Sequence, residues 1–122
     1  MRLIKFRGKR FTNGEWVYGS LIAFDGFCQI VVPPKGDDPF ENCSIAVIPE
    51  SIGQYAGVND VEDHEIWEGD LIKYGNDAPT EVVFKSDGCF TFKGCELPLG
   101  RFHISKMQVI GNIHDHKNLL EK

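Results

Sequence analysis

Three short glycine-containing turns, each lying between alternating apolar residues, constrain the fold of this chain more than any other feature. The segments are FTNGEWVYG (residues 11–19), LIAFDGFCQIVV (21–32) and EVVFKSDGCFTF (81–92). Asn-Gly and Asp-Gly pairs within such patterns predict β-hairpins, because glycine readily adopts the positive φ angles of tight turns. A chain with three such hairpins is predicted to consist mostly of antiparallel strands.

The first segment predicts a two-residue loop at Asn13-Gly14, since both residue types tolerate the positive φ angles of a type I′ turn. That loop sets Thr12 opposite Glu15 and Phe11 opposite Trp16, which would form an aromatic cross-strand pair.

The second segment predicts a two-residue loop at Asp25-Gly26 with Phe24 opposite Phe27. Alternation then gathers small and branched apolar side chains on one core face. This predicted face consists of Leu21, Ala23, Cys28, Ile30 and Val32. The strand is expected to end before Pro33-Pro34, because proline cannot donate to a ladder.

In the third segment a two-residue loop would mix polar and aromatic side chains on one face. A three-residue loop over residues 86–88 pairs Phe84 with Phe90 and Val82 with Phe92, and it gathers the aromatic rings on one side. We therefore predict the longer loop, with its glycine in the left-handed conformation.

The remaining sequence predicts further short elements. CSIAVIP (43–49) predicts a strand followed by a helical turn from Pro49, and EGDLIKYG (68–75) predicts a strand entered by a Gly69-Asp70 turn. One long strand is predicted over 101–114. Residues 115–122 predict a helix with Asp115 as N-cap and with Leu119 and Leu120 toward the core. The expected fold class is mostly β, a small sandwich or pseudo-barrel of short antiparallel strands with a short C-terminal helix.

Length and composition agree with one globular domain over residues 1–122, since 42% of the residues are hydrophobic and 25% are charged. No apolar run approaches the roughly 20 residues of a membrane span. The first ten residues are too charged for the apolar stretch of a signal peptide. We therefore expect a soluble cytoplasmic protein with no membrane partner.

The four cysteines predict free thiols rather than a metal or disulfide framework. They are Cys28, Cys43, Cys89 and Cys95. No two of them have the Cys-x2-Cys spacing of zinc sites, and a cytoplasmic protein is kept reduced.

An acidic stretch over residues 60–70 contains six carboxylates and His64, with no Lys or Arg. The carboxylates are Asp60, Glu62, Asp63, Glu65, Glu68 and Asp70. A twelve-residue calcium loop starting at Asp60 would need Gly at its sixth position and a carboxylate at its twelfth, where this chain has Glu65 and Leu71. The pattern predicts a hydrated turn that leads into a buried strand.

His114 and His116 lie two residues apart and would share one side of an extended chain. A metal would need a third ligand, from His64, His103 or a distant carboxylate. A strand end followed by a helix cap explains the same residues, so no metal and no cofactor is expected. Since Gly-x-Ser-x-Gly and phosphate-binding glycine motifs are also absent from the sequence, we predict no catalytic residue and no enzymatic activity.

The positive charge is concentrated at the N-terminus, although the net charge is −5. Residues 1–14 contain five basic and no acidic residues, and the rest contains eight basic and eighteen acidic ones. The five are Arg2, Lys5, Arg7, Lys9 and Arg10. They could bind nucleic acid together with Phe6 and Phe11, or they could form the hydrated side of a protected edge strand.

Several separated segments resemble one family. They are IKFRG (4–8), WVYGSL (16–21), VIPESIGQYAGVND (47–60), HEIWEGDLIKY (64–74) and VIGNIHDHKNLLE (109–121). Together they resemble the YopX-like proteins of phages and prophages, over essentially the whole chain from Arg2 to Glu121. Where this family uses an Asp-x-Asn-Gly type of turn, the chain has residues 60–64, which favours the turn interpretation of the acidic stretch. Glu68 and Asp70 are expected to bind nearby backbone N–H groups.

The resemblance implies a mostly β pseudo-barrel and an accessory role in phage biology, and it implies no catalytic residue or cofactor. The leading hypothesis is a non-enzymatic phage or prophage protein that binds a phage or host macromolecule in the bacterial cytoplasm; a second copy of the chain is one candidate partner. The alternative is nucleic-acid binding through the basic N-terminal hairpin. A metal-dependent enzyme using His114, His116 and the acidic stretch is the third hypothesis.

Overall fold

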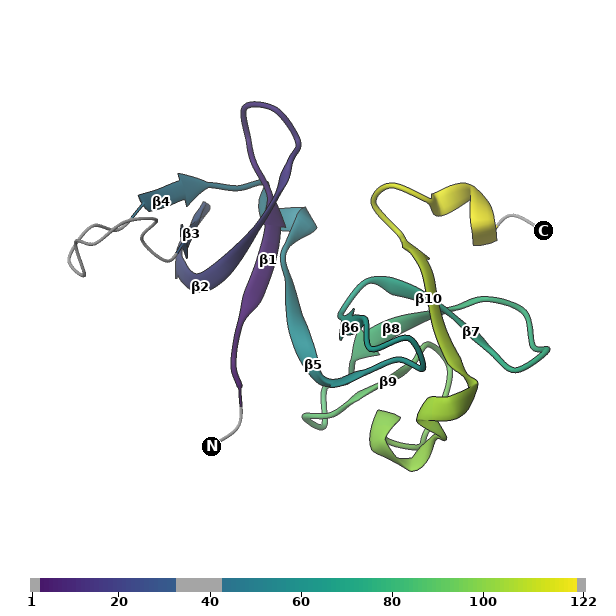
Figure 1. Ribbon diagram of the computed structural model, residues 1–122. Coiled ribbons are helices and arrows are strands. Elements are labelled where there is room, and N and C mark those ends of the chain that lie inside the picture. Colours follow the sequence, from purple (N-terminus) through teal and green to yellow (C-terminus); the bar gives the residue numbers. More distant parts are fainter. Residues whose placement is uncertain (1–2, 33–42, 121–122) are drawn as a thin grey trace. The chain divides into compact units, whose positions relative to one another are not determined.

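The computed structural model describes residues 3–32 and 43–120, and antiparallel strands dominate them (Figure 1). The predicted mostly β fold class is confirmed. By its internal contacts the chain comprises two compact units, residues 1–54 and 55–122. The prediction of one domain over residues 1–122 stays a prediction, and each unit is described below by itself.

The first unit is built on an antiparallel sheet with the strand order β4-β3-β2-β1-β5. Its elements are β1 (Phe6–Lys9), β2 (Trp16–Phe24), β3 (Phe27–Val32), β4 (Cys43–Ala46), the 3₁₀ turn η1 (Pro49–Ser51) and the start of β5 (Gly53–Asn59). The predicted strand before Pro49 and the helical turn after it are thus confirmed. An isolated bridge between Arg10 and Val47 also brings the chain after β4 against the end of β1.

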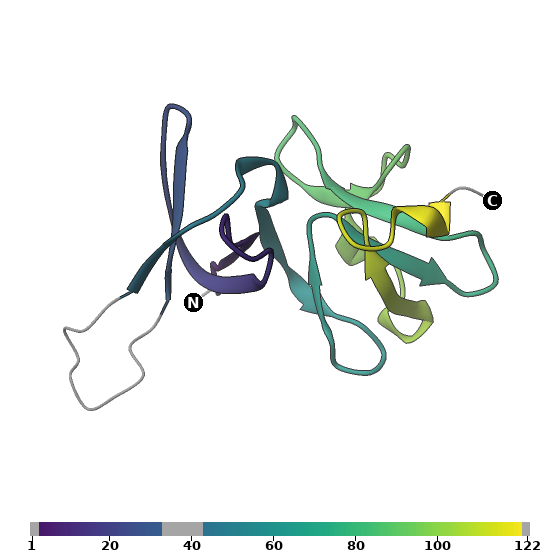
Figure 2. The same cartoon turned by 90° about the horizontal axis from the view of Figure 1, so that it is seen from above.

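β2 and β3 form a long hairpin (Figure 2). Its register is the predicted one, with Phe24 opposite Phe27 and Leu21 opposite Ile30. The predicted core face is only partly buried. Ile30 is fully buried, whereas Ala23 near the turn is exposed, and the other three predicted members are half-buried. β3 ends at Val32, and Pro33-Pro34 lies outside the described residues.

The β1–β2 hairpin differs from the prediction of a two-residue loop at Asn13-Gly14. Lys9 pairs with Trp16, and the N–H of Arg10 donates to the carbonyl oxygen of Glu15 at 2.7 Å. The loop therefore contains the four residues between Arg10 and Glu15.

The reason lies in the backbone of Asn13. A type I′ turn needs positive φ at both central residues, but of these two only Gly14 has it, at 72°. The Asn13 side chain instead accepts a hydrogen bond from the N–H of Glu15 at 3.0 Å, which stabilises a wider turn. Phe11 and Thr12, predicted to lie in the ladder, are exposed in the loop.

The second unit contains a four-stranded antiparallel sheet with the order β10-β7-β8-β9, and β6 pairs with the second half of β5. Its elements are β6 (Glu65–Trp67), β7 (Asp70–Tyr74), β8 (Thr80–Phe84), β9 (Phe90–Phe92), the 3₁₀ turns η2 (Leu99–Arg101), η3 (Ile104–Lys106) and η4 (Lys117–Leu120), and β10 (Met107–Asn112). Its core cluster consists of Ile66, Ile72, Val82, Phe92, Leu99 and Met107.

The β8–β9 hairpin confirms the predicted three-residue loop. Phe84 pairs with Phe90 and Val82 pairs with Phe92. Gly88 has a φ of 95°, as the left-handed residue of such a loop requires. The predicted strand after the Gly69-Asp70 turn is also confirmed as β7.

The predicted long strand over 101–114 is wrong, because the chain forms η2 and η3 before β10 begins at Met107. β10 ends at Asn112, whose side-chain oxygen accepts the N–H groups of His114 and Asp115, each at 2.9 Å. Residues 113 and 114, which were predicted to end the strand, therefore belong to this turn.

The predicted C-terminal helix is only the 3₁₀ turn η4. His116 rather than Asp115 directly precedes it, because the turn at Asn112 extends through Asp115. Leu119 is half-buried, and the side chain of Leu120 lies outside the described residues. In the described ranges, no helix has the length and apolar character needed to cross a membrane.

Candidate functional site

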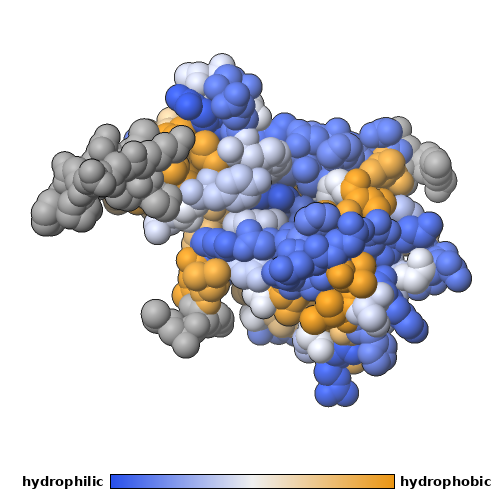
Figure 3. All heavy atoms as spheres, in the orientation of Figure 1, coloured by the Kyte–Doolittle hydropathy of each residue, from blue (hydrophilic) through white to orange (hydrophobic). Residues whose placement is uncertain are grey.

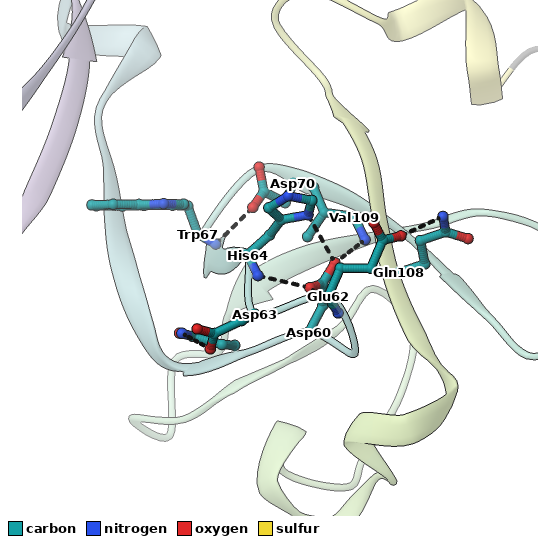
Figure 4. Close-up of polar contacts among 9 residues, drawn as sticks. Asp60, Glu62, Asp63, His64, Trp67, Asp70, Gln108 and Val109 are labelled. Carbon is teal, nitrogen blue, oxygen red and sulfur yellow. Dashed lines mark hydrogen bonds and ion pairs between the residues drawn. The ribbon is translucent and has the colours of Figure 1, made fainter.

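Asp60 organises the acidic stretch through several polar contacts (Figure 4). Its side chain is completely shielded from solvent. One carboxylate oxygen, Oδ1, accepts the backbone N–H groups of Glu62 at 2.9 Å and His64 at 2.8 Å. The other, Oδ2, accepts the N–H of Val109 on β10 at 2.9 Å. Asp60 thus fastens the turn to a strand that lies 49 residues further along the chain.

The three N–H groups decide the ionisation of Asp60. Burial alone raises the pKa of this carboxyl group. The hydrogen bonds from Val109, His64 and Glu62, together with the His64 side chain 3.6 Å from Oδ2, outweigh burial and hold the pKa of Asp60 below its ordinary value of 3.8. Asp60 is therefore a charged structural acceptor at neutral pH.

Two neighbouring acids of the turn accept hydrogen bonds from side chains on β10 and at the end of β5. Glu62 accepts the side-chain N–H of Gln108 at 3.0 Å, and Asp63 accepts that of Asn59 at 2.9 Å. Asp63 has a positive φ of 64°, so the chain reverses direction here without a glycine. These contacts support the interpretation of the stretch as a turn.

Asp70 begins β7 and is as buried as Asp60. Its Oδ2 accepts the backbone N–H of Trp67 at 2.8 Å, as expected for an acid at the entrance of this strand. The expectation of a hydrated stretch therefore fails for Asp60 and Asp70, which are buried, and it holds for Glu62, Asp63 and His64, which are exposed.

The four histidines are engaged in separate places. His64 lies beside Asp60, and His116 Nδ1 accepts the N–H of Asn112 at 3.2 Å. His103 donates its backbone N–H to the Tyr74 hydroxyl, and the His114 ring lies near Gly69. Over residues 3–32 and 43–120, no three His, Cys, Asp or Glu side chains lie where they could hold one metal ion.

The three cysteines whose side chains the structure describes are free thiols. Cys28, Cys89 and Cys95 are each half-buried and unbridged. Cys89 lies 3.5 Å from the Asp87 carboxylate, and burial together with this acid raises the pKa of the Cys89 thiol. A raised pKa keeps the thiol protonated and weakly nucleophilic.

The basic N-terminal residues do not share one surface. Arg7 and Lys9 lie on one face of β1, where they pair with Tyr18 and Trp16. Arg10 falls on the opposite side of the alternation and bridges to Val47. Lys5 precedes β1 and continues the alternation of Arg7 and Lys9, and Arg2 lies outside the described residues.

The side of the sheet that carries Arg7 and Lys9 is rich in aromatic residues, and we call it the aromatic face. Directly paired residues share a side of the sheet, and so do alternate residues along a strand. On β1, β2 and β3 the aromatic face contains Arg7, Lys9, Trp16, Tyr18, Ser20, Ile22, Phe24, Phe27, Gln29 and Val31. The grouping follows from the sequence in either register, since the predicted pairing of Phe11 with Trp16 also sets Lys9 opposite Tyr18, and a shift of two positions leaves each side chain on the same side of the sheet.

The aromatic face combines exposed rings with positive charge. The exposed fractions are 46% for Tyr18, 70% for Phe24 and 48% for Phe27. Hydrophobic residues also reach the surface in other parts of the described chain (Figure 3). The Arg7 guanidinium lies 4.6 Å from the centre of the Trp16 ring, and Lys9 Nζ lies 5.5 Å from it. These are cation–π contacts.

The fold and these contacts define a small, mostly β protein with structural carboxylates and an exposed aromatic surface. A model of the family described as YopX protein matches residues 5–121. The chain therefore belongs to the YopX family, which confirms the predicted resemblance.

One solved structure supports the fold. The crystal structure of protein EF1440 from Enterococcus faecalis is similar to this chain with a TM-score of 0.63 and 21% sequence identity. The similarity covers 98% of this chain and 99% of that one. No curated protein matches the sequence.

Proposed function

We propose that this chain is a phage- or prophage-derived accessory protein that acts without catalysis, by binding another macromolecule in the cytoplasm of the bacterial host. Membership of the YopX family supports the phage connection. The observation that carries the binding function is the aromatic face, on which Tyr18, Phe24 and Phe27 are largely exposed.

Exposed rings of this size favour binding over catalysis as the role of the surface. Large aromatic side chains are costly to leave in water and contribute strongly to interfaces. The two buried carboxylates, Asp60 and Asp70, accept backbone N–H groups and so act in the structure of the second unit. Because Asp60 and Asp70 are held in these structural contacts, the proposed binding does not involve them.

A capture experiment with the full chain tests this function. Tagged wild-type protein, the double variant Phe24→Ser with Phe27→Ser, and the control Phe84→Ser are exposed to lysate of the phage-carrying host. Phe84 is a matched control, because it is half-exposed and also flanks an Asp-Gly hairpin turn, in the second unit. Circular dichroism checks that all three proteins are folded.

We expect the wild type and Phe84→Ser to retain the same specific protein or nucleic acid, and the double variant to lose it. Mass spectrometry and nuclease treatment identify what is retained. Light scattering of the purified chain detects a second copy as the partner. Retention of the same macromolecules by all three proteins, or of none by the wild type in either assay, would contradict the proposal.

A further inference from the structure

We infer that the aromatic face binds single-stranded nucleic acid. This inference rests on the proposed function and names the ligand class for the same surface. It follows from the spacing of the rings, from the charge beside them and from the charge of the rest of the chain.

The spacing of the rings fits an extended ligand with repeated flat groups. Tyr18 and Phe24 are six residues apart on β2, which is about 20 Å of extended strand. Phe27 lies directly opposite Phe24, so both residues lie at the hairpin end of the face. Unpaired bases stack on exposed aromatic side chains in this way, and they do so with little dependence on sequence.

The positive charge beside Trp16 and Tyr18 complements a phosphate backbone, whereas the exposed Asp25 in the turn between Phe24 and Phe27 does not. Residues 1–14 contain no acid, and Lys9 is half-buried with its Nζ over the Trp16 ring. Arg7 is only 6% exposed and packs on the same ring, so Lys9 is the better placed cation for a phosphate. An acidic protein partner would match this charge, but it would not supply a series of flat groups to stack on the exposed aromatic side chains.

The rest of the chain limits the kind of nucleic acid. Residues 1–54 contain six basic and six acidic residues, whereas residues 55–122 contain seven basic and twelve acidic ones. The net charge of the second unit therefore repels a polyanion, whereas the first unit is neutral overall and places Arg7 and Lys9 on the aromatic face. In a duplex the bases stack on one another and cannot reach Tyr18, Phe24 or Phe27, so a single strand is the ligand that this face accepts.

Fluorescence anisotropy with labelled oligothymidylate and oligouridylate, each of about eight nucleotides, tests the inference, since small β-barrel modules contact roughly 4–16 nucleotides. The full-length chain is titrated at several salt concentrations. The variants are Lys9→Gln, the double variant Phe24→Ala with Phe27→Ala, and two controls in the second unit. The controls are Lys73→Gln, an exposed lysine on β7, and Phe84→Ala.

We expect the wild type to bind a single strand of at least one sugar type and to bind a duplex of the same length more weakly. The double variant Phe24→Ala with Phe27→Ala should weaken binding by at least about fivefold, the effect of losing one stacked base at the lower end of the range. Lys9→Gln should reduce the slope of log affinity against log salt by about 0.7, the value for one phosphate contact on a single strand. Lys73→Gln and Phe84→Ala should match the wild type.

Equal affinity for single and double strands, equal effects of the face variants and their controls, or no binding of either oligonucleotide at low salt would overturn the inference. In the last case, a protein that is captured by the wild type and lost by the Phe24→Ser, Phe27→Ser variant would still support the proposed function. The two proposals therefore fail separately.

Discussion

Asp60 shows how one carboxylate can hold a turn and a distant strand together. Replacing it by Asn keeps one oxygen for the N–H groups of Glu62 and His64, but it turns the other acceptor into an NH₂ group that faces the N–H of Val109. A buried donor left without an acceptor and the loss of a charge-assisted bond should together lower the free energy of unfolding by about 2–3 kcal/mol. Urea unfolding of Asp60→Asn measures this.

Asp63→Asn is the matched control, since it makes the same chemical change in the same turn. Asn tolerates the positive φ of residue 63 and keeps an oxygen for Asn59. The free energy of unfolding of Asp63→Asn should lie within about 0.5 kcal/mol of the wild-type value. Equal losses in the two variants would contradict the role assigned to Asp60.

The lowered pKa of Asp60 predicts a pH dependence. In the unfolded chain the pKa of this group has its ordinary value of 3.8, and in the folded chain the pKa is lower. Ionised Asp60 therefore contributes stability above that unfolded value, and the contribution is lost as the pH falls through the folded pKa. The difference in free energy of unfolding between wild type and Asp60→Asn should shrink below about pH 4. A difference that stays constant from neutral pH to about pH 3 would contradict this.

Part of this site could have been predicted from the sequence. The bond from Asp60 to the N–H of Glu62, two residues on, is a local turn contact that Asp commonly makes. The bond to Val109 spans 49 positions and depends on where β10 runs, which no local pattern specifies. The burial of Asp60 follows from that long-range contact, and this explains why the stretch was expected to be hydrated.

At the level of elements, the three predicted hairpins differ in how strongly their registers were determined. The registers of β2–β3 and β8–β9 were predicted correctly, because a shift by one residue would have mixed apolar and polar faces. At Asn13-Gly14 either loop length leaves aromatic and basic residues on both sides. The hydrogen bond from the N–H of Glu15 to Asn13 and the bridge from Arg10 to Val47 decided the register there.

Close packing in the first unit makes Gly19 a sensitive position on β2. A Cβ atom at residue 19 would lie 2.1 Å from the carbonyl oxygen of Val31 and 3.2 Å from the Ile30 side chain. The backbone of β3 would have to move, so Gly19→Ala should lower the free energy of unfolding by about 2–3 kcal/mol. Thermal or urea unfolding followed by circular dichroism measures the change.

Gly100→Ala is the control for this prediction, because a Cβ atom at residue 100 meets no atom within 4 Å. It should change the free energy of unfolding by no more than about 0.5 kcal/mol. If Gly19→Ala is as stable as Gly100→Ala, then β2 and β3 do not approach each other as closely as described.

Across the whole molecule, the buried apolar residues are distributed unevenly between the two units. Of those described, Ile30 and Val47 lie in the first unit. The other eight lie in the second: Ile66, Trp67, Leu71, Ile72, Val82, Phe92, Leu99 and Met107. Composition cannot reveal this difference, since the apolar residues of the first unit are numerous but mostly half-buried, as Leu21 is, or exposed, as Phe24 and Phe27 are.

This distribution predicts different local stabilities. Regions with few buried apolar contacts open more easily than the regions around a core. In hydrogen–deuterium exchange followed by mass spectrometry, peptides covering β7, β8 and β10 should therefore exchange more slowly than peptides covering β2 and β3. The sheet ladders provide hydrogen bonds in both regions, so the comparison reports on burial rather than on the presence of secondary structure. Equal protection in the two regions would contradict this prediction for the isolated chain. The measurement is therefore repeated at a protein concentration too low for self-association, where a second copy cannot protect β2 and β3.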